Sequence, residues 1–385
     1  MSFLLLIVKS AFRNRLRTTL TAVGVAIAIV AFLFLRTFIS AWYAGVESSS
    51  SDRMVVRNKI SIIFPLPIAY LDKIKQVPGV EEVTYQNWFG GIYIDEKNFF
   101  AQFASDDGLF KLYPEATTPP EQMQAYMNDR TGALVGQHLA EKYGWKIGDT
   151  VTLKGAIYPG DWKFTIRGIY TSTSKTFDVS TMFFHWKYFN EAIPERLQNQ
   201  IGIAIVKIKS GVDSAQVASA IDKTFVNSLA ETRTESEKQF QLEFISMASA
   251  VIDAIQVVSF VVLIILMLIL GNTLAMATRE RTTEYAVMRA IGFRPAHVVW
   301  LVLGEGFVIA AVGVALGLAM AAPVLKTFAQ IFEKQLGAFL GSFDLDPKVI
   351  ALAVAVALGL GMLASVIPAW RSGRLKIVDA LRRIE

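Results

Sequence analysis

The run RERTTEYAVMRAIGFRP, residues 279–295, combines charge and apolar spacing in a way that suits contact with another surface. Its apolar residues, including Tyr285, Ala286, Met288, Ala290 and Ile291, recur at near-helical spacing. An apolar stripe can bury in a groove while charged side chains form ion pairs at the rim. The charged residues of the run are Arg279, Glu280, Arg281, Glu284, Arg289 and Arg294. This chemistry predicts a short docking helix.

A helix that only lies on anionic lipid is the alternative for this segment. Such a helix predicts basic residues alone on its polar face. Glu280 and Glu284 argue against that interpretation and favour a protein partner.

Residues that could carry catalysis or hold a metal ion are sparse. The histidines, His138, His185 and His297, form no cluster with metal-ligand spacing, and the sequence contains no cysteine. The HExxH, GxSxG and GxxxxGK[ST] patterns are absent from it. The pair Asp106 and Asp107 is interpreted as a solvated turn rather than a catalytic dyad. We therefore expect no catalytic residue, metal or cofactor in this chain.

Four uncharged apolar stretches account for the mean hydropathy of +0.42. Each approaches or exceeds the ~20 residues that a helix needs to cross ~30 Å of hydrocarbon. The stretches are 18–35, 254–278, 306–325 and 349–370. Buried helices of a soluble core are the alternative, but charged flanks on all four favour four transmembrane helices.

Lys and Arg are distributed unevenly around these stretches. The segments 9–17, 279–294 and 371–385 hold thirteen of them, whereas the loop 326–348 holds three. By the positive-inside rule, both termini and the docking helix lie in the cytoplasm. The same asymmetry accounts for the net charge of +5, so a nucleic-acid partner is not needed. We expect a multi-pass membrane protein whose large domain between the first two spans lies outside the cytoplasm.

The residues between the first two spans predict an α+β domain. Strand–helix patterns within 54–85 and 201–225 bracket an insertion at about 96–199, which indicates two subdomains. Inside the insertion, TVTLKG and DWKFTIRGIYT are interpreted as paired strands. The SSSSD stretch at 48–52 is either a flexible joint or the frayed end of a long helix.

The expected organisation follows from these assignments. The segments are an amphipathic elbow 1–17, the first span 18–41, the α+β domain 42–245, the second span 250–278, the docking helix 279–297, the third span 298–325, a short outer loop 326–347, the fourth span 348–370 and a cytoplasmic tail 371–385.

Polar residues inside the spans are expected to pair or to face a cavity. For Glu305 we expect a structural partner among Arg13, Arg15, Arg17 or the backbone, rather than a role in proton transport. Arg36 is expected to extend its guanidinium to the outer headgroups. A GxxxG pattern at 313–317 fits close helix packing.

Three stretches resemble motifs of one family. VKSAFRNRLRTTLTAVGVAIAIVAF leads basic residues into the first span. GNTLAMATRERTTEYAVMRAIGFRPAHV has the intramembrane Asn272 as its second residue. IPAWRSGRLKIVDALRRIE closes the chain, with Ile377 where the family usually has proline. Together with the layout, these stretches resemble the permeases of MacB/FtsX-type ABC transporters, also called type VII or mechanotransmission systems.

The resemblance implies a place in the bacterial inner membrane, with the large domain in the periplasm, and a coupling function for the docking helix. The helix would dock in a separate ABC ATPase, which binds ATP and Mg, through the six charged residues named above. Two permease copies would form a homodimer that transmits nucleotide-driven motion to the periplasmic domains. The large outer domain is similar to those of the efflux (MacB) and lipoprotein-release (LolC/LolE) branches, which stay open here. Efflux would add a periplasmic adaptor and an outer-membrane channel as partners.

A different class of function remains as the alternative. The chain would then be a membrane-anchored extracytoplasmic binding or signalling protein without an ATPase. The helix at 279–295 discriminates between the two, because a simple anchor does not need it.

Overall fold

The computed structural model describes residues 3–47, 50, 52–173, 177–246, 248–336 and 346–374. The chain divides into a helical unit, residues 1–40, 249–330 and 343–385, and an α+β unit, residues 41–248 and 331–342. Of the SSSSD stretch, only Ser50 and Asp52 are described. Residues 337–345 of the predicted outer loop and 375–385 of the predicted tail lie outside the described residues.

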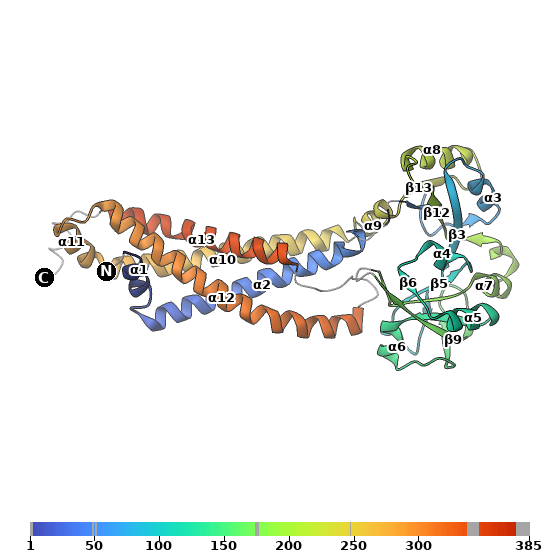
Figure 1. The fold of residues 1–385 in the computed structure, drawn as a ribbon, viewed down its shortest axis with the longest axis horizontal. Coiled ribbons are helices and arrows are strands. Elements are labelled where there is room, and N and C mark those ends of the chain that lie inside the picture. The colour runs from blue at the N-terminus through green and yellow to red at the C-terminus, as the bar shows by residue number, and fades with distance from the viewer. Residues whose placement is uncertain are drawn as a thin grey trace. The chain divides into compact units, whose positions relative to one another are not determined.

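Four described helices of the chain are long and apolar enough to cross a membrane. They are α2 (Arg15–Glu47), α10 (Ser249–Glu280), α12 (Pro295–Leu336) and α13 (Pro347–Gly373). Two shorter helices, α1 (Phe3–Ala11) and α11 (Thr282–Ala290), lie at one end of the helical unit (Figure 1). The predicted membrane fold with four spans and an α+β domain between the first two is confirmed.

Small residues on α12 let α2 approach it closely. A Cβ atom added to Gly313 would lie 2.5 Å from Cγ1 of Val25, and one added to Gly317 would lie 2.8 Å from Cβ of Ile29. Real Cβ contacts are essentially never this short. The predicted GxxxG pattern therefore packs one span against another within this chain.

We expect Gly313→Ala to destabilise the helical unit because the new methyl group overpacks the contact with Val25. Overpacking of this kind typically costs about 1–3 kcal/mol. The matched control is Gly359→Ala on α13, where an added Cβ meets nothing within 4 Å. Unfolding of the purified chain in mixed micelles measures both variants. Equal stability of the two would contradict the packing described for α2 and α12.

One sheet organises the α+β unit. Among the described residues it has eleven strands, in the order β13-β1-β12-β3-β5-β10-β7-β9-β8-β4, with β6 pairing to β9. A separate pair joins β11 (Gln200–Ile201) to β2 (Leu66–Pro67). The sheet strands are β1 (Arg53–Asn58), β3 (Val80–Trp88), β4 (Gly91–Ile92), β5 (Ala101–Ser105), β6 (Ala116–Thr117), β7 (Gly132–Gly136), β8 (Thr150–Gly155), β9 (Gly160–Ser172), β10 (Thr181–His185), β12 (Ile203–Ile208) and β13 (Thr232–Ser236).

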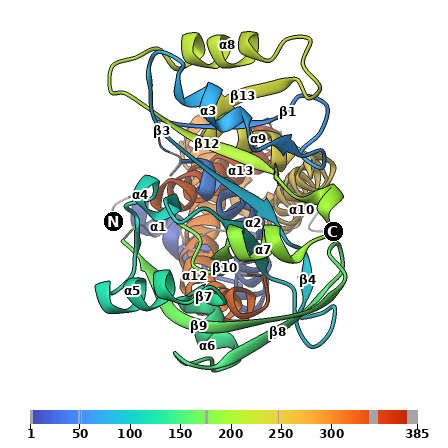
Figure 2. The ribbon, with the colours of Figure 1, turned by 90° about the vertical axis from the view of Figure 1, so that its right-hand side faces the viewer.

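The predicted insertion extends this sheet. The antiparallel pairing of β3 with β5 joins the strands on either side of the insertion to those within it. The predicted pairing of TVTLKG with DWKFTIRGIYT is confirmed by the antiparallel register of β8 and β9. Figure 2 shows α3 and α8 beside the end of the sheet that β13, β1, β12 and β3 form. The helices of the unit are α3 (Tyr70–Lys75), α4 (Leu109–Leu112), α5 (Pro120–Asn128), α6 (Gln137–Tyr143), α7 (Trp186–Ala192), α8 (Ser214–Thr224) and α9 (Glu237–Ser246), with a 3-10 turn at Glu195–Leu197.

Both faces of β1 are buried. Met54 and Val56 of β1 belong to one apolar cluster, and Val55 belongs to another. Successive side chains of a strand point to opposite faces, so the two clusters lie on opposite sides of the sheet. The unit therefore has a core of its own.

Candidate coupling site

The turn after α11 explains the glycine of the predicted docking helix. Gly292 has φ +110°, a backbone conformation that glycine adopts readily and other residues rarely do. Its N–H donates to the carbonyl of Arg289 at 3.1 Å, and the N–H of Phe293 donates to the carbonyl of Met288 at 3.1 Å. These bonds close the C-terminal end of α11 and lead the chain into Pro295, the first residue of α12.

One face of α11 packs into the helical unit. Tyr285 and Ala286 are buried, and Tyr285 shares an apolar cluster with Ile7 of α1 and Val298 of α12. Burial, assisted by the negative charge of Glu305, raises the pKa of Tyr285 to about 12. The phenol therefore stays neutral at physiological pH and acts as a core side chain.

A buried ion pair fixes the start of α11. Nη1 of Arg281 lies 3.0 Å from Oε2 of Glu305, and the two side chains are 11% and 5% exposed. Arg281 Nη2 also donates to the backbone carbonyl of Ser10 at 2.9 Å, and the Ser10 hydroxyl donates to Glu305 at 3.2 Å. We name Ser10, Arg281 and Glu305 the Arg281 cluster. It joins α1, the start of α11 and α12.

The Arg281 cluster changes the expected partner of Glu305 and the expected role of Arg281. Glu305 has a structural partner as expected, but this partner is Arg281, so the expected identity (Arg13, Arg15, Arg17 or the backbone) was wrong. Arg281 itself was grouped with the residues that contact an ATPase. In the structure its side chain is buried within the chain, where it can position α11 without being exposed.

The opposite face of α11 is exposed and apolar. Ile291 is 75% exposed, and Val287, one helical turn earlier, is exposed as well. Phe293 follows them on the turn and is also exposed. We name Val287, Ile291 and Phe293 the α11 face. Sequence reasoning included Ile291 in the apolar stripe but missed Val287 and Phe293, although the spacing of Val287 and Ile291 carried that signal.

Charged side chains surround the α11 face. Glu284 pairs with Arg13 at 2.7 Å, and Glu280 pairs with Arg17. Because Glu284 and Glu280 are about half-exposed, these pairs contribute little stability and can be exchanged for contacts with a partner. Among the other predicted site residues, Arg279 and Arg294 are exposed and Arg289 is half-buried.

The two remaining intramembrane residues lie apart from the Arg281 cluster. Asn272 is exposed on α10. The Arg36 guanidinium lies over the ring of Phe32 on the same helix, 5.6 Å from the ring centroid. Within the described part of the chain, no group of three or more His, Asp or Glu residues could hold a metal ion.

Two family models match the chain. The FtsX-like permease C-terminal model matches residues 256–377, and the MacB-like periplasmic core domain model matches residues 18–224. The second match alone covers more than half of the chain. Together the two matches cover most of α2 and α10, which flank the α+β unit, and the whole of α11.

Known proteins that resemble this chain align with different fractions of its length. An uncharacterized ABC transporter permease of Methanocaldococcus jannaschii is 23% identical over 98% of this chain and 97% of its own length. The macrolide export ATP-binding/permease protein MacB of Chromobacterium violaceum is 30% identical over 29% of this chain and 16% of its own. The periplasmic region of MacB from Actinobacillus actinomycetemcomitans aligns with 52% of this chain and 95% of its own, with 12% identity and a TM-score of 0.39.

Proposed function

Because this chain belongs to the MacB/FtsX-like family of ABC transporter permeases, we propose that it couples ATP hydrolysis by a separate ATPase to motion of its α+β unit. The observation that carries this proposal is the construction of α11. Its buried face is tied into the helical unit by the Arg281 cluster, and its other face presents exposed apolar side chains ringed by charge. A helix held firmly on one side and unpartnered on the other suits the transmission of a force from a docked protein.

The α11 face has the composition of a protein contact. Apolar residues at the centre of an interface exclude water, while rim charges fix the register. Glu280 and Glu284 are the rim acids, and Arg279 and Arg294 are exposed rim bases. We propose that this face docks in the ATPase, which binds ATP and Mg, and that the chain itself has no catalytic residue.

The division of labour is testable by enzyme assay. The purified chain alone is expected to hydrolyse no ATP. The chain co-expressed with its ABC ATPase is expected to co-purify with that ATPase, and this sample is expected to hydrolyse ATP. Release of phosphate measures both. Hydrolysis by the isolated chain, free of any ATPase by mass spectrometry, would refute the proposed division.

The proposed location is the cytoplasmic membrane, with α11 and both termini in the cytoplasm and the α+β unit outside. The asymmetry of Lys and Arg supports this orientation. The proposed work is efflux, or release of a substrate such as a lipoprotein, from the outer side. An efflux role would add an adaptor and an outer-membrane channel as partners.

The proposed assembly is a homodimer that contacts through α10. This helix is the least covered of the four spans, 17% buried compared with 28–44% for the others. Asn272 is exposed on it at helical spacing from the exposed Leu268 and Met276. An amide inside a membrane gains a partner when a second helix covers it, with a contribution of about 1–2 kcal/mol in model peptides.

A further inference from the structure

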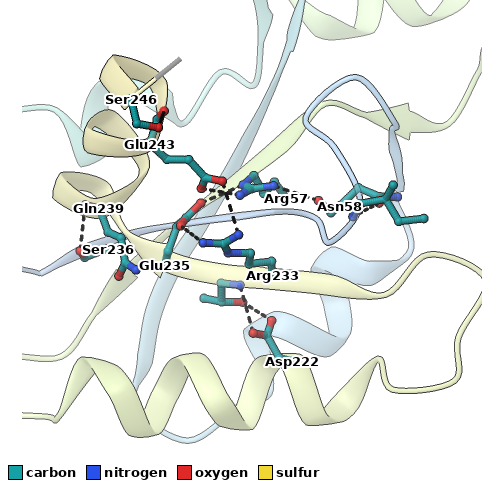
Figure 3. Close-up of polar contacts among 11 residues, drawn as sticks. Arg57, Asn58, Asp222, Arg233, Glu235, Ser236, Gln239, Glu243 and Ser246 are labelled. Atoms are coloured by element: carbon teal, nitrogen blue, oxygen red, sulfur yellow. Dashed lines mark hydrogen bonds and ion pairs between the residues drawn. The ribbon is translucent and has the colours of Figure 1, made fainter. Parts of the chain in front are cut away.

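A closed ring of four charges lies where α9 meets the sheet (Figure 3). Arg57 of β1 donates from Nε to Glu235 at 2.8 Å and from Nη2 to Glu243 at 2.6 Å. Arg233 of β13 closes the ring, with its Nη2 3.4 Å from Glu235 and its Nη1 3.4 Å from Glu243. Three members belong to the strands, and only Glu243 belongs to α9. The ring is neutral only while α9 is in place.

The strand register makes the ring dependent on α9. Arg57 and Arg233 are directly opposite in the antiparallel pairing of β1 with β13. Like charges at opposite positions destabilise a strand pair. Without Glu243, the two arginines would share only Glu235, so the helix supplies the second carboxylate that the strands require.

A second buried arginine binds the other end of α9. Arg53 lies two residues before Val55 on the same face of β1 as Arg57, since side chains alternate along a strand. Its Nε donates to Glu237, the first residue of α9, at 2.9 Å. The Tyr113 hydroxyl donates to the same carboxylate at 3.1 Å. Phe240, between the two acids of α9, packs on the apolar cluster that contains Val55.

The place of these contacts in the chain gives them a role. β1 is the first strand after α2, and α9 is the last helix before α10. The two arginine sites therefore join the segment through which the chain enters the α+β unit to the one through which it leaves. A displacement of β1 or of α9 therefore strains the same group of ion pairs.

We propose that the Arg53–Glu237 pair and the four-charge ring form a clasp that fixes α9 to β1 and β13, so that a displacement of α10 enters the sheet through α9. The transmission part rests on the proposed function. The clasp itself is a property of the α+β unit and can be measured in the absence of nucleotide.

Hydrogen–deuterium exchange of the full chain in nanodiscs tests the clasp. The variant is Glu237→Gln combined with Glu243→Gln, which keeps the shape of both side chains and removes both charges. Arg53 keeps Glu115 at 2.8 Å and Arg57 keeps Glu235 at 2.8 Å, but both lose the carboxylate that α9 supplies. Exchange of the α9 amides is therefore expected to become at least about tenfold faster, because the ion pairs that hold α9 to the strands are removed. The strands β8 and β9 serve as an internal reference and are expected to exchange as in the wild type.

The matched control is Glu231→Gln. Glu231 pairs with Lys59 at 2.7 Å, two residues from Arg57 and Arg233 at the same end of the strand pair, and this pair does not involve α9. In the Glu231→Gln variant the α9 amides are expected to exchange as in the wild type. Unchanged α9 exchange in the double variant, or equal acceleration in the control, would overturn the clasp.

A nucleotide experiment separates the clasp from the proposed function. With the ATPase bound, addition of ATP and Mg is expected to change exchange in β12 of the wild type. In the double variant this change is expected to disappear, while the rate of ATP hydrolysis stays unchanged. No change in the wild type would refute the proposed function but leave the clasp to be judged by α9 exchange alone. A change in β12 that persists in the double variant would refute transmission through α9.

Discussion

Replacement of Glu305 with Gln is expected to destabilise the helical unit by about 3–5 kcal/mol, because it leaves the buried cation of Arg281 without a counter-charge. Glu305 is 5% exposed, so water cannot replace the lost carboxylate. The backbone carbonyl of Ser10 still accepts from Arg281, but a neutral acceptor does not compensate the charge. Unfolding in mixed micelles and proteolysis at α1 measure the effect.

The control for this prediction is Glu280→Gln. Glu280 makes the same kind of pair with Arg17, but its side chain is 56% exposed. An exposed pair contributes about 0–1 kcal/mol, so the control is expected to be close to the wild type. Equal stability of Glu305→Gln and the wild type would show that the Arg281 cluster does not hold α11.

A double replacement separates stability from positioning. Arg281→Met with Glu305→Leu removes both charges and keeps the volume apolar. Substitutions of this kind are often neutral or stabilising for a buried ion pair. We expect the double variant to recover stability but to stimulate the ATPase less than the wild type, because α11 loses its link to Ser10.

The second large effect is expected for Ile291→Asp. Ile291 is the most exposed apolar residue of the α11 face, and docking would bury it at the centre of a contact. A charge without a partner there is expected to weaken the complex by at least 2 kcal/mol, or about thirtyfold. The amount of ATPase retained by the purified permease measures this change. Ile94→Asp, at a site of similar exposure in the α+β unit, is the control and is expected to retain the ATPase.

Glu284→Lys distinguishes a protein partner from a lipid surface. If α11 only lay on anionic lipid, the added cation would strengthen its attachment by about 1 kcal/mol. In a groove of the ATPase it would lose a rim pair or face a like charge, which slows association and weakens the complex instead of strengthening it. We expect normal membrane insertion and reduced ATPase recruitment. Retention of the ATPase at the wild-type level would favour the lipid interpretation.

The sequence predicted those features that depend on local pattern. The apolar stretches identified the spans because a membrane helix must satisfy its backbone internally and cover itself with apolar side chains. The charge and spacing of residues 279–295 identified a distinct helix. The alternation in TVTLKG and its partner identified the β8–β9 pair.

Features that depend on contacts between distant segments were not predictable in this way. Arg281 and Glu305 lie on different helices, and only the fold shows that they meet instead of Glu305 and Arg17. The faces of α11 were likewise decided by packing, because Tyr285 and Ile291 belong to one apolar stripe in sequence but differ in burial. The four-charge ring around Arg57 depends on the register of β1 with β13, which no local pattern in either strand specifies.

The mass of the intact assembly tests the proposed permease function. Native mass spectrometry of the chain co-purified with its ABC ATPase is expected to give two permease chains with two ATPase chains. Asn272→Leu is expected to shift part of this assembly toward single permeases, because the amide of α10 no longer supplies its contact. A permease that remains monomeric and carries no ATPase under the same conditions would contradict the proposal that α11 couples this chain to ATP hydrolysis.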